Sequence, residues 1–316
     1  MTIKTVYTHL RPGHIDDVVG ASVLAALLMA EVKFVHPQDP ALPSILADPN
    51  AATVDVGGHY DPARMHFDHH HDASLPCAAV LVLQEVPAWQ SSAAWTYMSI
   101  KDTQGPHEAA RQTREVSTEA DIATERRVAC MSPSADLGMA WLRAGLLGQR
   151  FHTFGDLVGW LHERAGDERI NEAERVLRMT RARSLLALEI SRSVPMVLPD
   201  GEMTRVVLPG DTHAHGHAHA FLATEAFHRH NASIAVSYSE WPGEKSTWKI
   251  TRAESLQGRI DFSRLRGASE VSFAHNSGHM AVLHSAMPTC ADDVTDLIRR
   301  AWTGATAVRN DLLKSA

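Results

Sequence analysis

Short β-branched runs alternate with helix-like segments over the first 100 residues of this chain. We expect strands at residues 3–8, 32–35 and 52–56, and helices at residues 17–30, 43–46, 77–85 and 93–100. In the first of these helices, Val18, Ala21, Leu24 and Leu28 fall on one stripe. Strands that alternate with helices form βαβ units, which build a parallel sheet. The pattern therefore predicts an α/β fold with a mostly parallel N-terminal sheet.

The rest of the chain predicts a second domain. A helical stripe runs through residues 167–191, and Pro195 and Pro199 follow it. Beyond these prolines we expect strands at residues 206–208, 233–238 and 247–251 and a helix at residues 292–302. A length of 316 residues is ordinary for two domains. We therefore expect an N-terminal domain over residues 1–195 and a smaller α+β domain over residues 196–316.

Composition excludes several classes of protein. An apolar fraction of 44% argues against a disordered or fibrous chain. The longest apolar run, residues 18–30, is too short to span a bilayer, and the first strand begins too early to leave room for a secretory signal. Three widely spaced cysteines argue against a disulfide framework and favour a reducing compartment. We expect a cytoplasmic protein without membrane association.

The distribution of charge leaves open whether the chain binds nucleic acid. A net charge of -7 argues against nucleic-acid binding over the whole surface, but it leaves a local basic groove possible. Residues 245–266 are basic and lie near Trp241 and Trp248, which is typical of a surface for single-stranded nucleic acid. A solvated strand pair with scattered charge is the alternative. Sequence leaves the oligomeric state open, with a homodimer as one alternative.

Histidine is the most unusual part of the composition. The chain has 20 histidines, roughly two to three times average usage. Three groups of His and Asp stand out: His9-x4-His14-x-Asp16-Asp17 between the first strand and the first helix, Asp55 at the end of a strand before Gly57-Gly58, and Asp68-His69-His70-His71 in the polar loop after Phe67. Each group alone is also typical of surface or turn residues. Because ligands bind outside the carboxyl ends of parallel strands, the ordered combination predicts a shared metal site. Histidine and aspartate without thiolates suit Mn²⁺, Mg²⁺ or Zn²⁺.

Four segments carry a family resemblance. They are Thr8-His9 with His14-Ile15-Asp16-Asp17, then Val54-Asp55-Val56-Gly57-Gly58-His59-Tyr60-Asp61-Pro62, then Phe67-Asp68-His69-His70, and finally Phe273-Ala274-His275-Asn276-Ser277-Gly278. In order and spacing they resemble the DHH phosphoesterase superfamily and, more narrowly, the melanocyte-proliferating-gene type of nuclease. The resemblance covers most of the chain, strongly over residues 5–105 and weakly over residues 205–300.

The resemblance implies a pair of divalent ions, most often Mn²⁺, with Mg²⁺, Fe²⁺ and Zn²⁺ as alternatives. The metal ligands that it implies are His9, His14, Asp16, Asp55, His69 and Asp102. His9 and His14 would hold the first ion, and Asp16 and His69 the second. Asp55 would bridge the two. Asp102 is the candidate for a fourth carboxylate, which we expect in a later loop.

The resemblance also implies residues for catalysis and substrate binding. His70 and Asp68 are the expected catalytic pair, and His70 would face the substrate. Imidazole titrates near neutral pH, so His70 suits proton donation to a leaving oxygen. The expected phosphate-binding residues are His275, Asn276, Ser277 and Gly278. The family's paired glycines after this segment are replaced here, beginning with His279, which alters the expected contacts with the substrate.

Several functions fit this pattern. Two close cations can lower the pKa of a shared water and stabilise the attacking and leaving oxygens of a displacement at phosphorus. We expect a metal-dependent 3′-to-5′ exonuclease acting on RNA or short oligonucleotides. A small-molecule phosphatase acting on pyrophosphate or a nucleotide is one alternative, and a non-catalytic metal- or nucleotide-binding module is another. The alternating histidines from His213 to His219 predict either an accessory metal site on a strand or an exposed loop.

Overall fold

The fold is taken from a computed structural model. It describes residues 2–37, 39–72, 74–87, 89–146, 149–209, 219–239, 247–283 and 291–304. The chain forms two compact units, residues Met1–Met179 and Thr180–Ala316. The domain boundary at residue 195 stays a prediction, because the units divide within a long helix. No helix among the described residues is long and apolar enough to cross a membrane.

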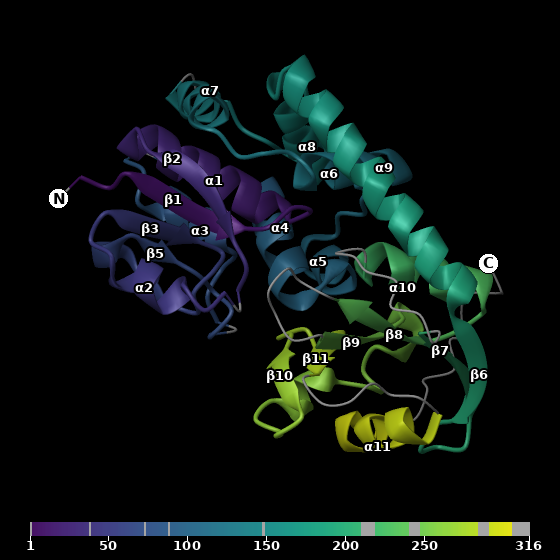
Figure 1. The fold of residues 1–316 in the computed structure, drawn as a ribbon. Coiled ribbons are helices and arrows are strands. Elements are labelled where there is room, and N and C mark those ends of the chain that lie inside the picture. Colours follow the sequence, from purple (N-terminus) through teal and green to yellow (C-terminus); the bar gives the residue numbers. More distant parts are fainter. Residues whose placement is uncertain are drawn as a thin grey trace. The chain divides into compact units, whose positions relative to one another are not determined.

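The first unit holds a five-stranded sheet and most of the helices (Figure 1). Its strands are β1 (Thr5–His9), β2 (Glu31–Val35), β3 (Ala51–Val54), β4 (Tyr60–Asp61) and β5 (His66–Phe67). Its helices are α1 (Ile15–Leu28), α2 (Leu42–Ala47), the 3₁₀ turn η1 (Pro62–Arg64), α3 (Ala78–Gln84), α4 (Ala93–Gln104), α5 (Pro106–Thr113), α6 (Glu119–Ala129), α7 (Ala135–Leu146) and α8 (Phe154–Arg164). Helix α9 (Asp167–Ile190) continues into the second unit.

Strand order in the first sheet is β2-β1-β3-β5-β4. All pairs are parallel except β4–β5. The chain leaves β1 through α1 to reach β2 on one side, and then returns through α2 to β3 on the other side of β1. The connections after β1 and β3 therefore diverge, and adjacent strands with diverging connections form the crevice in which open α/β sheets bind ligands.

Alternate residues of β1 pack on opposite faces of this sheet. Val6 is fully buried in the main core with α1, whereas Tyr7 packs with Leu42 of α2 in a smaller cluster. Helix α1 approaches the sheet closely, since a Cβ on Gly20 would lie 2.8 Å from Cγ1 of Val54. The predicted α/β class with a mostly parallel sheet is confirmed.

The second unit holds a six-stranded sheet of order β10-β11-β9-β8-β7-β6. The strands are β6 (Arg192–Val197), β7 (Met203–Leu208), β8 (Ile234–Ser239), β9 (Thr247–Arg252), β10 (Val271–Ala274) and β11 (Met280–Leu283). The helical segments are α10 (His219–Arg229), η2 (Glu254–Leu256), η3 (Phe262–Leu265) and α11 (Ala291–Ala301). Only the β7–β8 pair is parallel among these described strands.

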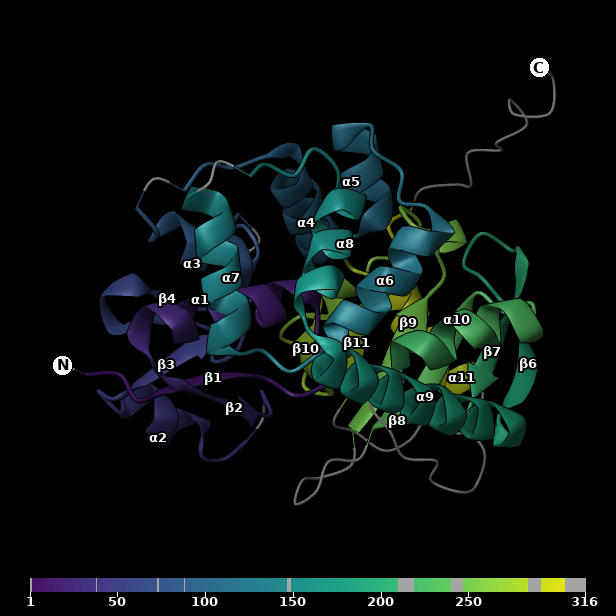
Figure 2. The ribbon, with the colours of Figure 1, turned by 90° about the horizontal axis from the view of Figure 1, so that it is seen from above.

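Both faces of the second sheet carry helices. Val294 and Ile298 of α11 join a buried cluster with Ile250 on one face. Ala226 of α10 packs with Ala235 of β8 on the other (Figure 2). The sheet is mostly antiparallel, so this unit is the expected α+β domain in class.

Several elements differ from the sequence expectation. Helix α1 begins at Ile15, two residues before the expected start, so Asp16 and Asp17 lie in its first turn. The strand β6 contains Pro195, which the sequence had suggested as a break. Pro195 is tolerated because β6 is the edge strand of its sheet, where one row of N–H groups needs no partner. Of the alternating histidines, His213, His215 and His217 lie outside the described residues.

Candidate metal centre

The candidate site begins with the connection between β1 and α1. His9 is the last residue of β1, and His14 is the N-cap of α1 with extended backbone (φ -119°, ψ 173°). Asp16 and Asp17 follow in the first turn and are 1% and 2% exposed. The positive end of the helix dipole stabilises carboxylates at this position. The loop itself is tight, because a Cβ on Gly13 would lie 2.0 Å from Oδ2 of Asp17.

A second group of residues follows β3 and β5. Asp55 comes directly after β3 and has a left-handed backbone (φ 60°), which aspartate tolerates better than most residues. Its backbone N–H donates to the carbonyl of Phe67 at 2.9 Å, which joins the ends of the two strands. Asp68 and His69 follow β5 and are 2% exposed. These contacts bring Asp55 beside His69, although 14 positions separate them in the sequence.

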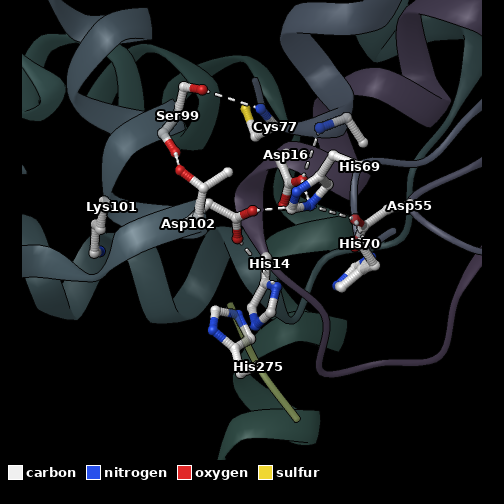
Figure 3. A network of polar contacts seen from close by, with 12 residues as sticks. His14, Asp16, Asp55, His69, His70, Cys77, Ser99, Lys101, Asp102 and His275 are labelled. Carbon is white, nitrogen blue, oxygen red and sulfur yellow. Dashed lines mark hydrogen bonds and ion pairs between the residues drawn. The ribbon is translucent and has the colours of Figure 1, made fainter. Parts of the chain in front are cut away.

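His69 lies at the centre of the cluster (Figure 3). Its Nε2 lies 3.2 Å from Oδ1 of Asp55, 3.1 Å from Oδ2 of Asp102 and 4.0 Å from Oδ2 of Asp16. His14 Nδ1 lies 3.5 Å from Oδ1 of Asp102. The structure thus brings together five of the six expected ligands through these distances.

Two sets of potential metal ligands result. Asp55, His69 and His70 form one set, and His14, Asp16 and Asp102 form the other, and within each set the donor atoms lie within 4.8 Å of one another. His69 Nε2 and Asp102 Oδ2, 3.1 Å apart, connect the sets. The donors are imidazole nitrogens and carboxylate oxygens, a set that suits Mn²⁺, Mg²⁺, Fe²⁺ or Zn²⁺.

Asp102 lies in a different kind of element from the one we expected. The sequence predicted a loop, but Asp102 is in the last turn of α4, which ends at Gln104 before Gly105 and Pro106. The signal for this was present, since Gly and Pro mark the end of a helix and both come after Asp102. A helix holds the carboxylate more rigidly than a loop would.

Several buried polar atoms of the cluster make no hydrogen bond to the described residues. Both carboxylate oxygens of Asp55, Oδ1 of Asp16 and both ring nitrogens of His69 are buried without a hydrogen-bond partner among the described residues. His69 Nε2 lies 3.2 Å from Oδ1 of Asp55, but one imidazole faces three carboxylates, and burying several carboxylates together costs roughly several kcal/mol unless cations or protons compensate them. The donor set therefore fits divalent cations, and Asp55 is the residue that would hold both of a pair.

Burial and close contacts also shift the pKa values of the His and Asp residues in the cluster. Burial lowers the pKa of His9 to about 4, although the charge of Asp55 opposes the effect, so His9 is neutral and available as a ligand at neutral pH. Burial and the neighbouring Asp102 and Asp55 raise the pKa of Asp16 well above its usual range. Burial alone would lower the pKa of His69, but Asp102 and Asp55 raise it to about 12. A proton on His69 thus offsets part of the negative charge of the surrounding carboxylates.

Asp68 and His70 form a hydrogen-bonded pair beside the cluster. Oδ1 of Asp68 accepts from the His70 Nδ1–H at 2.7 Å and from the His70 backbone at 2.9 Å, and Oδ2 accepts from the Gly58 backbone at 2.7 Å. His70 Nδ1 also lies 3.6 Å from Oδ1 of Asp55. Burial works against a charged imidazole, but Asp55 and Asp68 raise the pKa of His70 above its ordinary value. The neighbouring His71 is exposed and belongs to neither donor set.

Sequence reasoning assigned no role to Asp17. Burial and the charge of Asp55 raise its pKa well above the usual range. Its carboxylate also bonds the backbone of His14, a candidate ligand. The sequence signal for such a role was the pair of adjacent acidic residues, Asp16 and Asp17, at the start of a helix. The structure shows that Asp17 is buried against the preceding loop.

The expected phosphate-binding residues lie in the second unit. His275, Asn276, Ser277 and Gly278 form the turn between β10 and β11. Their role in binding substrate stays a prediction.

Three arginines of the basic stretch are engaged within the second unit, whereas Trp241 and Lys245 lie outside the described residues. Arg252 Nη2 donates to the carbonyl of Ser277 at 3.4 Å, and Arg266 Nη2 donates to the carbonyl of Ala274 at 3.1 Å. Arg259 is 7% exposed and pairs with Asp200 at 2.5 Å. These arginines support the fold, so they contribute little to a nucleic-acid surface.

Comparisons with known proteins locate the resemblance. Residues 5–77 match the model of the family MYG1_exonuc, described as "Uncharacterised protein family (UPF0160)". Among curated proteins, none matches. Among solved structures, the pGpG-specific phosphodiesterase PggH from Vibrio cholerae is 15% identical, with a TM-score of 0.38 over 95% of this chain and 99% of that chain.

A second solved structure is RecJ from Thermus thermophilus in complex with Mn²⁺. It is 14% identical, with a TM-score of 0.44 over 94% of this chain and 51% of that chain, so this chain spans about half the length of RecJ. The family match includes every motif residue from His9 to His70. The resemblance to the nuclease family that the sequence motifs indicated is therefore confirmed over residues 5–77.

Proposed function

We propose that this chain is a divalent-metal-dependent phosphodiesterase that removes nucleotides from the 3′ end of short RNA oligonucleotides. The observation that carries the proposal is the pair of donor sets at the carboxyl ends of β1, β3 and β5. Both oxygens of Asp55 are buried there without a hydrogen-bond partner among the described residues. A carboxylate in this state suits a bridge between two cations.

The residues divide between two candidate ion positions. His14, Asp16 and Asp102 would hold one ion, and Asp55 and His69 are the donors nearest the other, with His70 of the same set kept for proton donation. His9 lies close enough to Asp55, His14 and His70 for their charges to shift its pKa, so it is near both donor sets. When bound, two divalent cations supply positive charge that stabilises the developing charge of an in-line displacement at phosphorus.

His70 is the candidate proton donor to the leaving oxygen. Its Nδ1–H donates to Asp68 at 2.7 Å, which fixes the orientation of the ring, and Nε2 is the nitrogen that we propose to face the substrate. Asp68 in turn is held by the backbone N–H of Gly58, so the direction of the imidazole is set by the chain. The raised pKa of His70 favours the protonated ring that such a donor requires.

The charge of the second unit supports a preference for short substrates. Arg252, Arg259 and Arg266 contact other residues of that unit, so these three cationic side chains are already paired. A long polymer gains most of its affinity from such grooves through its phosphates. This favours short oligonucleotides, and residues 275–278 remain the proposed phosphate-binding residues.

The test uses the full chain loaded with Mn²⁺, with metal content measured by elemental analysis. Substrates are end-labelled RNA oligonucleotides, RNA dinucleotides and pyrophosphate, at matched concentrations. We expect turnover of dinucleotides, stepwise 3′ shortening of RNA, and loss of both in Asp68→Ala and His70→Gln. His71→Gln, which changes the exposed neighbour, serves as the matched control and keeps full activity.

Other outcomes would contradict the proposal in different ways. Turnover of pyrophosphate alone would assign a small-molecule phosphatase. A metal-loaded wild-type protein that turns over none of the substrates would indicate a binding module.

A further inference from the structure

Helix α3 begins at a point where side chains of two other helices of the first unit bond to its backbone. The N–H of Cys77, the N-cap residue, donates to Oγ of Ser99 in α4 at 3.0 Å (Figure 3). The next N–H, of Ala78, donates to Oδ2 of Asp16 in α1 at 3.3 Å. Backbone N–H groups at the start of a helix have no partner within the helix, so α1 and α4 supply the acceptors. The start of α3 thereby joins α1 to α4.

The α1 side of this junction is closely packed. A Cβ on Gly20 of α1 would lie 3.2 Å from Cα of Ala79 in α3, so the two helices approach closely at this point. Asp16, one turn before Gly20, is 1% exposed. Its Oδ2 accepts from Ala78, whereas its Oδ1 is buried without a hydrogen-bond partner among the described residues. Oδ1 is therefore the oxygen of Asp16 that is best placed to bind a cation.

The α4 side of the junction carries a second candidate ligand. Ser99 precedes Asp102 by three positions, so the two residues are neighbours on the surface of α4. In the same turn, Oγ1 of Thr103 donates to the carbonyl of Ser99 at 2.8 Å. Donor atoms of Asp102, Asp16 and His14 lie within 4.8 Å of one another. Because Ser99 and Asp102 share one turn, the bond from Cys77 to Ser99 fixes the place of that turn beside Asp16.

Repulsion between carboxylates opposes this arrangement. Carboxylate oxygens of Asp16, Asp55 and Asp102 all lie within 4.0 Å of Nε2 of His69. Like charges repel more strongly in a buried site than in water. The hydrogen bond of Ser99 holds α4 in place against this repulsion. It uses no oxygen of Asp102, so it does not compete with a cation for that carboxylate.

We propose that Ser99 is a positioning residue for the candidate metal centre: through its bond to Cys77 it holds Asp102 where this carboxylate and Asp16 can bind one cation. The inference rests on the proposed function, because a divalent cation is the ligand assumed. Ser99 acts through Asp102 and is not itself a ligand. Removing its hydroxyl takes the acceptor from the Cys77 N–H and loosens α4 at the turn that carries Asp102.

Isothermal titration calorimetry of Mn²⁺ into the chelator-treated full chain measures this role without an assay of activity. Loss of an outer partner of a metal ligand weakens metal binding about 10-fold to 100-fold, and the lower limit applies to a residue that acts through the backbone. We expect Ser99→Ala to raise the Kd of one ion about ten-fold and to leave the Kd of the other within about two-fold. Ser99→Thr keeps the hydroxyl and should restore both Kd values. Thr96→Ala is the matched control, since it removes a hydroxyl of α4 that donates to the carbonyl of Ser92, and it should change neither Kd.

Several results would refute the positioning role. They are a Kd in Ser99→Ala equal to that of the wild type, or equal losses for both ions, which would indicate a general loosening of the fold. The Tm of each variant in chelator shows whether it is folded. If Ser99→Ala does not fold, Ser99→Cys takes its place, because sulfur is a weaker acceptor of similar shape. Equal Kd values for Ser99→Cys and Ser99→Thr would then refute the role.

A double-mutant cycle shows whether the effect of Ser99 passes through Asp102. In an Asp102→Ala background, Ser99→Ala should cause little further loss of Mn²⁺ affinity, because the carboxylate that Ser99 positions is already absent. A loss as large in that background as in the wild type would overturn the inference.

These measurements separate the inference from the proposed function. If Ser99→Ala weakens one ion as expected but the wild type cleaves no phosphodiester, the proposed function fails alone. If phosphodiesters are cleaved but Ser99→Ala binds both ions as the wild type does, this inference fails alone. A wild-type protein that binds no Mn²⁺ would overturn both.

Discussion

Asp55 is the residue whose removal has the largest expected consequence. Both of its oxygens are buried and lack a hydrogen-bond partner among the described residues, and one of them lies 3.2 Å from His69. If Asp55 bridges two ions, Asp55→Ala removes a ligand from both. His14→Ala, in contrast, affects only the donor set of His14, Asp16 and Asp102.

The size of the effect follows from linkage between binding and unfolding. An ion at 100 times its Kd stabilises the native state by about 2.7 kcal/mol, so two ions contribute roughly 5 kcal/mol. For a unit of about this size, 1 kcal/mol shifts Tm by about 2–4 °C, so saturating Mn²⁺ should raise the Tm of the wild type by about 10–20 °C. We expect about half of that shift in His14→Ala and almost none in Asp55→Ala.

The measurement is differential scanning calorimetry of the full chain in a chelator and in excess Mn²⁺. Asp72→Asn is the matched control, because Asp72 is an exposed carboxylate four positions after Asp68 and should leave the Mn²⁺ shift unchanged. A shift in Asp55→Ala as large as in the wild type would refute the bridging role. Equal, half-sized shifts in Asp55→Ala and His14→Ala would indicate two independent sites.

Two further predictions concern catalysis and pH. Asp68→Asn should lower kcat on dinucleotides about 10²-fold or more, because an amide cannot accept from both Gly58 and His70, and a kcat within two-fold of the wild type would contradict this. In the second unit, burial opposes ionisation of Asp200, but its bonds to backbone and to Arg259 hold its pKa below the usual range. Asp200→Asn should therefore cost about 1 kcal/mol of unfolding free energy at neutral pH. Because the folded-state pKa is lowered, the wild-type advantage should persist down to about pH 4 and vanish as pH falls through that pKa. An advantage that grows on acidification, measured by urea unfolding, would contradict the assignment.

The sequence predicted those elements whose periodicity of apolar residues can be recognised within a short segment. The alternation over the first 100 residues predicted the parallel sheet, and the stripe at residues 167–191 predicted α9, because amphipathic period and burial are local properties. Helices α5 to α8 and the pair β10–β11 escaped prediction. Their short, mixed segments are stabilised by packing on other elements, which no local window records.

Some residues of the candidate site could be predicted from the sequence, and others depend on packing between distant segments. Asp55 and His69 were expected near each other because residues that follow adjacent parallel strands meet at one edge of a sheet. Asp102 reaches them from a helix, and its approach to His69 at 3.1 Å depends on how α4 packs on the first unit. The burial of Asp17 against Gly13 depends on close distances between atoms. Sequence spacing carries no such information.

Anomalous X-ray scattering from a crystal soaked in Mn²⁺ tests the central claim most directly. The account predicts two anomalous peaks in the first unit, one within ligand distance of His14, Asp16 and Asp102 and the other beside His69, with an oxygen of Asp55 directed at each. One peak, or none at these residues in a soaked crystal, would contradict the two-metal centre on which the proposed phosphodiesterase rests.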